Sequence, residues 1–115
     1  IDLADWMIDV HKTLERTRNT AYAYEGIIHA YELAKSQKDI NHTIKFRCVI
    51  EEGLSKLISW QVGGPIPNDF LKNHTTDDVM AIGGVMNHKQ EPPLRIDVTQ
   101  HQMHAIILAL RYIYN

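Results

Sequence analysis

The segment AYAYEGIIHAYELAKS, residues 21 to 36, decides the fold of this 115-residue chain. Its apolar side chains recur at helical spacing on two adjoining faces. The two faces consist of Ala23, Ile27, Ala30 and Ala34, and of Tyr24, Ile28 and Tyr31. A helix that is apolar over so much of its circumference is surrounded by other helices. We therefore predict an inner helix from about Thr20 to Ser36.

Amphipathic helices are predicted before and after this segment. The first ends at 16–19, and its apolar positions are Leu3, Trp6, Met7, Val10 and Leu14. The later one begins where Asp39 or Asn41 can cap it and runs to about Gln61. Its expected inner face consists of Ile44, Ile50, Leu54, Leu57 and Ile58. Gly53 in this helix permits a neighbouring helix to approach closely.

The last helix is predicted to begin at Thr99. Thr99 and Gln102 fit a capping box, in which each side chain bonds a backbone amide of the first turn. The following residues, MHAIILALRYIY at 103–114, are almost wholly apolar. We expect them to form a second buried helix.

Residues 62–98 are predicted to form a long ordered loop, because they hold all four prolines and four of the six glycines together with many apolar residues. Short helices at 68–73 and 76–82 and a ribbon pairing 84–86 with 94–96 are expected within it. The fold class is therefore all-α: one domain over 1–115, with four main helices as two hairpins. A loop of this length is the first place to look for a site.

The composition narrows the possible partners. The net charge of −2 gives no basic field that would attract nucleic acid or an anionic membrane, and we expect neither partner. No apolar stretch reaches the roughly 18 to 20 residues needed to cross a bilayer. Cys48, the only cysteine, is expected to be packed and inert. No cofactor is predicted, and the compartment is left open.

Two segments, NTAYAYEGIIHAYELAKSQ at 19–37 and GGVMNHKQEPPLRIDVTQHQMHAIILALRYIY at 83–114, carry a resemblance to a known architecture. Together they resemble the helical-hairpin repeats of α/α-toroid proteins of the six-hairpin type, which include several glycan-processing enzymes. The resemblance lies in the alternation of outer and inner helices, and no catalytic signature is matched. It implies a carboxy-terminal part of a toroid, with loops that lead into the inner helices lining a cleft.

The polar residues at the start of the last helix form the candidate site. Cleavage of a glycosidic bond needs two carboxyl groups, one that donates a proton and one that attacks or activates water. The predicted catalytic residues are Asp97, Glu25 and His101. Arg95, Gln100, His104 and Tyr24 are the predicted substrate-binding residues, and the expected ligand is a glycan.

Other interpretations of the same residues remain open. Asp97 can pair with Arg95 as part of the helix start, and the histidines can be hydrogen-bonded packing residues. Asp97, His101 and His104 are of a type that binds zinc or iron, but their spacing is loose and no metal is predicted. The rival function is a non-catalytic helical interaction module, which self-associates or assembles with a missing upstream segment.

Overall fold

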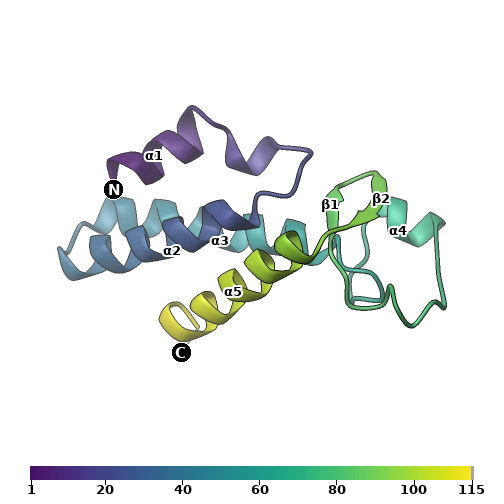
Figure 1. Ribbon diagram of the computed structural model, residues 1–115. Coiled ribbons are helices and arrows are strands. Elements are labelled where there is room, and N and C mark those ends of the chain that lie inside the picture. Colours follow the sequence, from purple (N-terminus) through teal and green to yellow (C-terminus); the bar gives the residue numbers. More distant parts are fainter. Residues whose placement is uncertain (115) are drawn as a thin grey trace.

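The computed structural model describes residues 1–114, apart from the side chain of Pro92, and it is mostly helical (Figure 1). Its elements are α1 (Asp2–Asp9), the short 3-10 helix η1 (Thr13–Glu15), α2 (Ala21–Ser36), α3 (Ile40–Ile58), α4 (Asp69–Asn73), β1 (Met86–His88), β2 (Glu91–Leu94) and α5 (Ile96–Tyr112). The all-α class is confirmed in this coarse sense, with a two-stranded ribbon added.

Helix α2 forms the centre of the molecule, as predicted. It packs against both α3 and α5, while α1 lies across it (Figure 1). The apolar residues of both predicted faces are buried: Ala23, Tyr24, Ile27, Ile28, Ala30, Tyr31 and Ala34. Both predicted faces of α2 are therefore covered by helical neighbours, while Tyr22, His29 and Leu33 on its remaining side are exposed.

Helix α3 begins at the predicted cap and returns along α2. The Asp39 carboxylate accepts a hydrogen bond from the His42 amide at 3.2 Å. Most of the predicted inner face is confirmed, because Ile50, Leu54 and Leu57 are buried. Ile44 was wrongly included, since it is 59% exposed, and the buried Phe46 and Val49 belong to the inner face as well. Cys48 is exposed as well, so the expectation of a packed thiol is corrected.

The closest approach between α2 and α3 occurs at Gly53. A Cβ atom placed on Gly53 would lie 2.1 Å from both Cζ and the hydroxyl of Tyr24. Since carbon atoms in contact are normally about 3.5–4.0 Å apart, only glycine leaves room for the phenol ring here. The prediction of a close helix approach at Gly53 is confirmed.

Helix α1 is shorter than predicted. It ends at Asp9, and Lys12 adopts a left-handed backbone conformation with φ 61° that no α-helix continues. The buried Thr13 hydroxyl then donates to the Met7 carbonyl at 2.8 Å, which turns the chain into η1. The chain reaches α2 through this turn and not as a single long helix.

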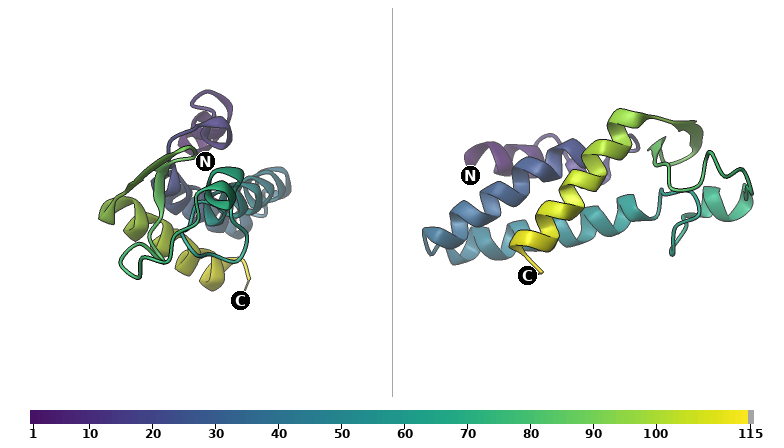
Figure 2. Two further views of the ribbon diagram at one scale, coloured as in Figure 1. Left: turned by 90° about the vertical axis from the view of Figure 1, so that its right-hand side faces the viewer. Right: turned by 60° about the horizontal axis from the view of Figure 1, so that its bottom comes forward.

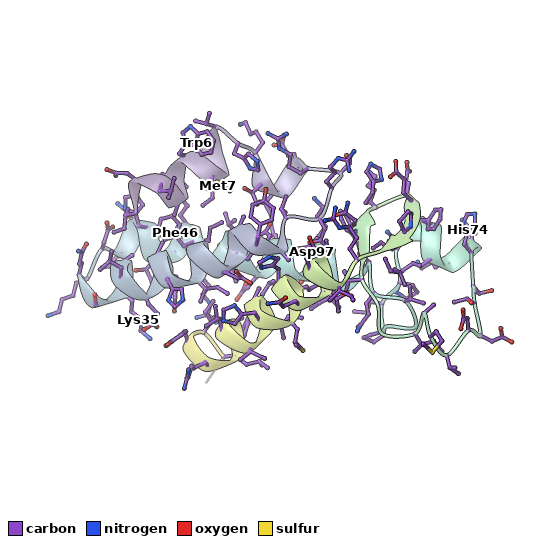
Figure 3. The ribbon with its side chains drawn as sticks, in the orientation of Figure 1. Trp6, Met7, Lys35, Phe46, His74 and Asp97 are labelled. Carbon is purple, nitrogen blue, oxygen red and sulfur yellow. The ribbon has the colours of Figure 1, made fainter. Side chains whose placement is uncertain are left out.

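The rotation of α1 also differs from the amphipathic prediction. Ala4 is the residue that packs into the core, while Leu3 and Trp6 are exposed. Figure 3 shows Trp6 projecting away from the helical body. The carboxylates of Asp5 and Asp9 instead face α3, where both accept hydrogen bonds from Lys45, at 2.6 and 2.8 Å.

Helix α5 begins at Ile96, three residues before the predicted start. Thr99 is inside the helix, where its hydroxyl donates to the Arg95 carbonyl at 3.0 Å, and Gln102 is buried, so the capping box is not formed. The expectation of a buried helix is also corrected, because Met103, Ile107 and Leu110 are each more than half exposed. Helix α5 is amphipathic, with α2 on one side only.

The segment between α3 and α5 is ordered, as predicted. Asn68 caps α4 by accepting from the Leu71 amide at 2.9 Å, which confirms the expected short helix. The second short helix is absent at 76–82, where turns occur instead. The expected ribbon forms closer to its turn, because β1 begins two residues later and β2 three residues earlier than predicted. The strands are antiparallel, with Met86 opposite Leu94.

Candidate functional site

Arg95 and Asp97 form an exposed ion pair at the start of α5. The Arg95 guanidinium donates two hydrogen bonds to the Asp97 carboxylate, at 3.0 and 2.8 Å. Asp97 also accepts from the Val98 amide at 2.9 Å. These bonds, the one from Arg95 above all, lower the pKa of Asp97 below its ordinary value. Asp97 is therefore ionised at neutral pH, the opposite of what a general acid requires.

A cavity of about 350 Å³ lies beside this ion pair. Its lining is mostly apolar and includes three polar side chains. The lining residues are Met80, Gly84, Leu94, Arg95, Ile96, Thr99, Gln100 and Met103. Two predicted substrate-binding residues, Arg95 and Gln100, thus share one cavity. Neither Asp97 nor Glu25 lines it.

Glu25 meets both predicted histidines across the contact between α2 and α5. Its Oε1 lies 3.0 Å from Nδ1 of His101 and 3.2 Å from Nδ1 of His104. Asp97 is one turn before His101 on the same face of α5. The adjacency of the two inner helices is confirmed, but each carboxylate already has its own partners. Figure 3 shows Asp97 at the end of α5 nearest the ribbon.

Tyr24 does not belong to a binding site. Its side chain is buried against Gly53, with 1% of the residue exposed, and this burial raises the pKa of its phenol to about 12. It cannot reach a ligand in the cavity at α5, so its predicted substrate-binding role is wrong. The tyrosine is a core residue that sets the spacing between α2 and α3.

A buried polar network that the sequence did not indicate connects the parts around the site. The Asn19 side-chain amide donates to the Met86 carbonyl at 3.1 Å and to Gln102 Oε1 at 3.3 Å. Gln102 in turn donates to the Leu57 carbonyl at 3.0 Å. The network joins the start of α2, the ribbon, α3 and α5. Gln102, directly before the apolar part of the last helix, was the available signal, because a buried amide needs partners.

An apolar groove of about 510 Å³ lies between α1 and α2. Its walls include Leu3, Met7, Tyr22, His29 and Leu33. Figure 3 shows Met7 on the side of α1 that faces α2. The groove carries little polar functionality beyond the imidazole and the phenol, so it offers no arrangement for acid–base chemistry.

Within residues 1–114, no group of three or more histidine, cysteine, aspartate or glutamate side chains is arranged to hold a metal ion. The helices described there are also too short or too polar to cross a membrane. No family model, curated protein or solved structure matches the chain. The residues and their geometry are therefore the basis for the functional proposals below.

Proposed function

We propose that this chain is a helical assembly module that acts by packing α5 against a second helical element. The observation that carries this proposal is the uncovered apolar side of α5. Ile96, Met103, Ile107 and Leu110 are all more than half exposed. They are separated by seven, four and three residues, so they share one side of the helix. In the right-hand view of Figure 2, α5 crosses in front of α2 and α3, with no other described segment over it.

Such a stripe differs from scattered surface apolar residues. Single exposed apolar side chains are ordinary, whereas a continuous apolar surface marks an interaction site. Intervals of three, four and seven residues are those of the heptad repeat of helices that pack along their length, with the polar Gln100 at the position between Ile96 and Met103. We refer to Ile96, Met103, Ile107 and Leu110 as the α5 stripe.

Sedimentation velocity with a matched pair of variants tests the proposal. Leu110→Lys places a charge on the α5 stripe, and Ile44→Lys places one on α3 at almost the same exposure, 58% against 59%. We expect the wild type and Ile44→Lys to associate reversibly, and Leu110→Lys to raise the dissociation constant at least tenfold. A wild-type chain that stays monomeric at millimolar concentration contradicts the proposal.

We propose the α/α toroid as the specific architecture of this helical module. The support is that α2 and α5, the two predicted inner helices, run side by side in the same direction (Figures 1 and 2). Inner helices of successive hairpins in a toroid have this relation. The predicted pairing into two hairpins has support for the first of them, α1 with α2, which contact each other.

Carbohydrate binding is the second candidate function, favoured by the cavity at the start of α5. Arg95, Thr99 and Gln100 supply donors and acceptors for hydroxyl groups, and the remaining wall is apolar. The volume of about 350 Å³ is at the lower end of ligand cavities. We propose binding and not cleavage, because the pKa of Asp97 is lowered and Asp97 is paired with Arg95.

An NMR titration with neutral and acidic oligosaccharides tests this second function. Shift changes are expected at the amides of residues 95–100, and Arg95→Ala is expected to weaken binding at least tenfold. Arg47→Ala, which removes an exposed arginine paired with Glu51 on α3, is the matched control. The protein must be dilute, because Ile96 and Met103 belong both to this cavity and to the α5 stripe. Absence of shifts across the panel rejects the function.

A further inference from the structure

We infer that the element that covers the α5 stripe is α5 of a second copy of this chain, in an antiparallel pair around a two-fold axis at Met103. The inference rests on the proposed assembly function and names its partner. Three features of α5 lead to it: the spacing of the apolar residues, the charges beside them and the surface area that they offer.

The first feature is that the α5 stripe is complementary to itself. Ile96 and Leu110 each lie seven residues from Met103, one before it and one after it. If two α5 helices pack antiparallel with Met103 on the axis, Ile96 of each copy meets Leu110 of the other. Ile107 then packs over Thr99 and Gln100 of the other copy. A two-fold interface requires this kind of self-complementary surface.

The second feature is a row of polar side chains directly beside the stripe. Asp97, His104 and Arg111 each follow a stripe residue by one position, so they lie along one flank of the stripe. A two-fold axis at Met103 brings Arg111 of one copy within about one helical turn of Asp97 of the other. In a parallel two-fold pair, this flank of one helix would face the opposite flank of the other, so Asp97 and Arg111 of the two copies would not meet. The charges therefore favour the antiparallel pair.

The side chains on this flank are available in the single chain. Arg111 is exposed, and Asp97 retains an exposed side chain beside Arg95. His104 lies near the axis and is held by Glu25 of its own chain at 3.2 Å. An arginine from the second copy would join the existing pair of Arg95 and Asp97, giving the carboxylate a second cationic partner.

The third feature is the area of the stripe, which sets the expected strength. At roughly 100 Å² for each of its four side chains, the stripe offers about 400 Å² per copy, about half of what one partner contributes to a standard interface. The exposed Met80 and Leu94 next to Ile96 extend the surface. We therefore expect a reversible dimer with a micromolar dissociation constant, not an obligate one.

Disulfide trapping tests the position of the axis. In a Cys48→Ser background, Met103→Cys places two thiols at the axis, while Ile44→Cys is a control at the same 59% exposure. Under mild oxidation we expect Met103→Cys to form a covalent dimer at least tenfold faster than Ile44→Cys. If the two cysteine variants form covalent dimers at equal rates while the wild type still associates, this inference is overturned and the assembly function stands. A monomeric wild type overturns both.

Exchange of the flanking charges tests the antiparallel direction. Arg111→Asp and Asp97→Arg are each expected to raise the dissociation constant of the homodimer about tenfold, because two opposite-charge pairs become like-charge pairs. A mixture of the two variants restores both pairs and is expected to form a heterodimer as tight as the wild-type dimer. A mixture no tighter than either variant alone overturns the antiparallel arrangement.

Discussion

Replacement of Gly53 by alanine tests the packing of α2 against α3, on which the rest of the fold depends. The new Cβ atom would lie 2.1 Å from Cζ of Tyr24 and 2.2 Å from Cε1. The ring would have to move by more than about 1 Å to restore a normal contact. Tyr24 is only 1% exposed, so its rigid ring has no solvent into which it can turn.

The expected size of the effect follows from two opposing terms. Overpacking a well-packed core costs about 1–3 kcal/mol, and the buried ring places this site near the upper end. Alanine in place of glycine inside a helix returns about 1 kcal/mol. We therefore expect Gly53→Ala to lower the free energy of unfolding by about 2 kcal/mol, which corresponds to a melting temperature about 8 °C lower.

Urea unfolding followed by circular dichroism measures this change, and two further variants control it. Gly26→Ala adds the same methyl group to α2, where nothing lies within 4 Å, and is expected to stabilise by up to about 1 kcal/mol. In a Tyr24→Leu background, Gly53→Ala should lose its penalty, because the ring is gone. If Gly53→Ala is as stable as the wild type, the described contact between Tyr24 and Gly53 is refuted.

Three further perturbations test other parts of the structure. Gln102→Leu removes the amide that donates to the Leu57 carbonyl at 3.0 Å, so it should lower the free energy of unfolding in urea by about 1–3 kcal/mol. The control Gln100→Leu, on the exposed side, should lower it by less than about 0.5 kcal/mol. Equal effects of the two variants would contradict the buried network. Cys48 is exposed, so it should react with a thiol reagent in the folded protein as fast as in urea, and protection would place it in the core. The His42 ring lies 2.7 Å from the carboxylates of both Asp5 and Asp39. The hydrogen bond with Asp5 contributes most to raising the pKa of His42 above its ordinary 6.5. The pKa of Asp5 is in turn lowered below its ordinary 3.8, mainly by Lys45. The extra stability of the wild type over His42→Gln should therefore be greatest between pH 3.8 and 6.5. It should decline as the pH rises through the raised pKa of His42, and decline again in acid as the carboxylates protonate. An advantage independent of pH from 4 to 9 would show that these ion pairs do not hold α1 to α3.

Helical periodicity predicted the existence of the main helices better than their rotation. It identified α2 fully, because a helix apolar on two adjoining faces leaves little choice of which side is buried. In α3 and α5, apolar residues occupy more of the circumference than the core can cover. Periodicity alone therefore included Ile44 in the inner face of α3, where the structure leaves it exposed, and did not include the buried Phe46.

The end of α1 and the role of Gln102 also differ from the predictions, the first for a local and the second for a tertiary reason. The end of α1 depends on the left-handed conformation of Lys12, for which a lysine side chain gives no signal. Gln102 fits a capping box in the sequence, but it has buried partners on α3 and next to α2 that are distant along the chain. Contacts of this kind follow from the tertiary fold and cannot be inferred from neighbouring residues.

The sequence predicted which residues of the candidate site lie together only where that follows from helix adjacency. Glu25, His101 and His104 come together because α2 and α5 are adjacent, as the sequence indicated. Arg95 and Asp97, two residues apart, satisfy each other at the start of α5. Tyr24 was assigned to the wrong surface because tyrosine is common both in binding sites and in cores, and its burial depends on a single glycine on α3.

Isotope-filtered NMR on an equal mixture of labelled and unlabelled protein tests the central claim most directly, because it detects only contacts between copies. Pairing of the two α5 helices predicts intermolecular signals between the methyl groups of Ile96 and Leu110, and between the Met103 methyl groups of the two copies. Intermolecular signals that join Ile96 to Ile96, or the absence of any signal from α5 at millimolar concentration, would contradict it.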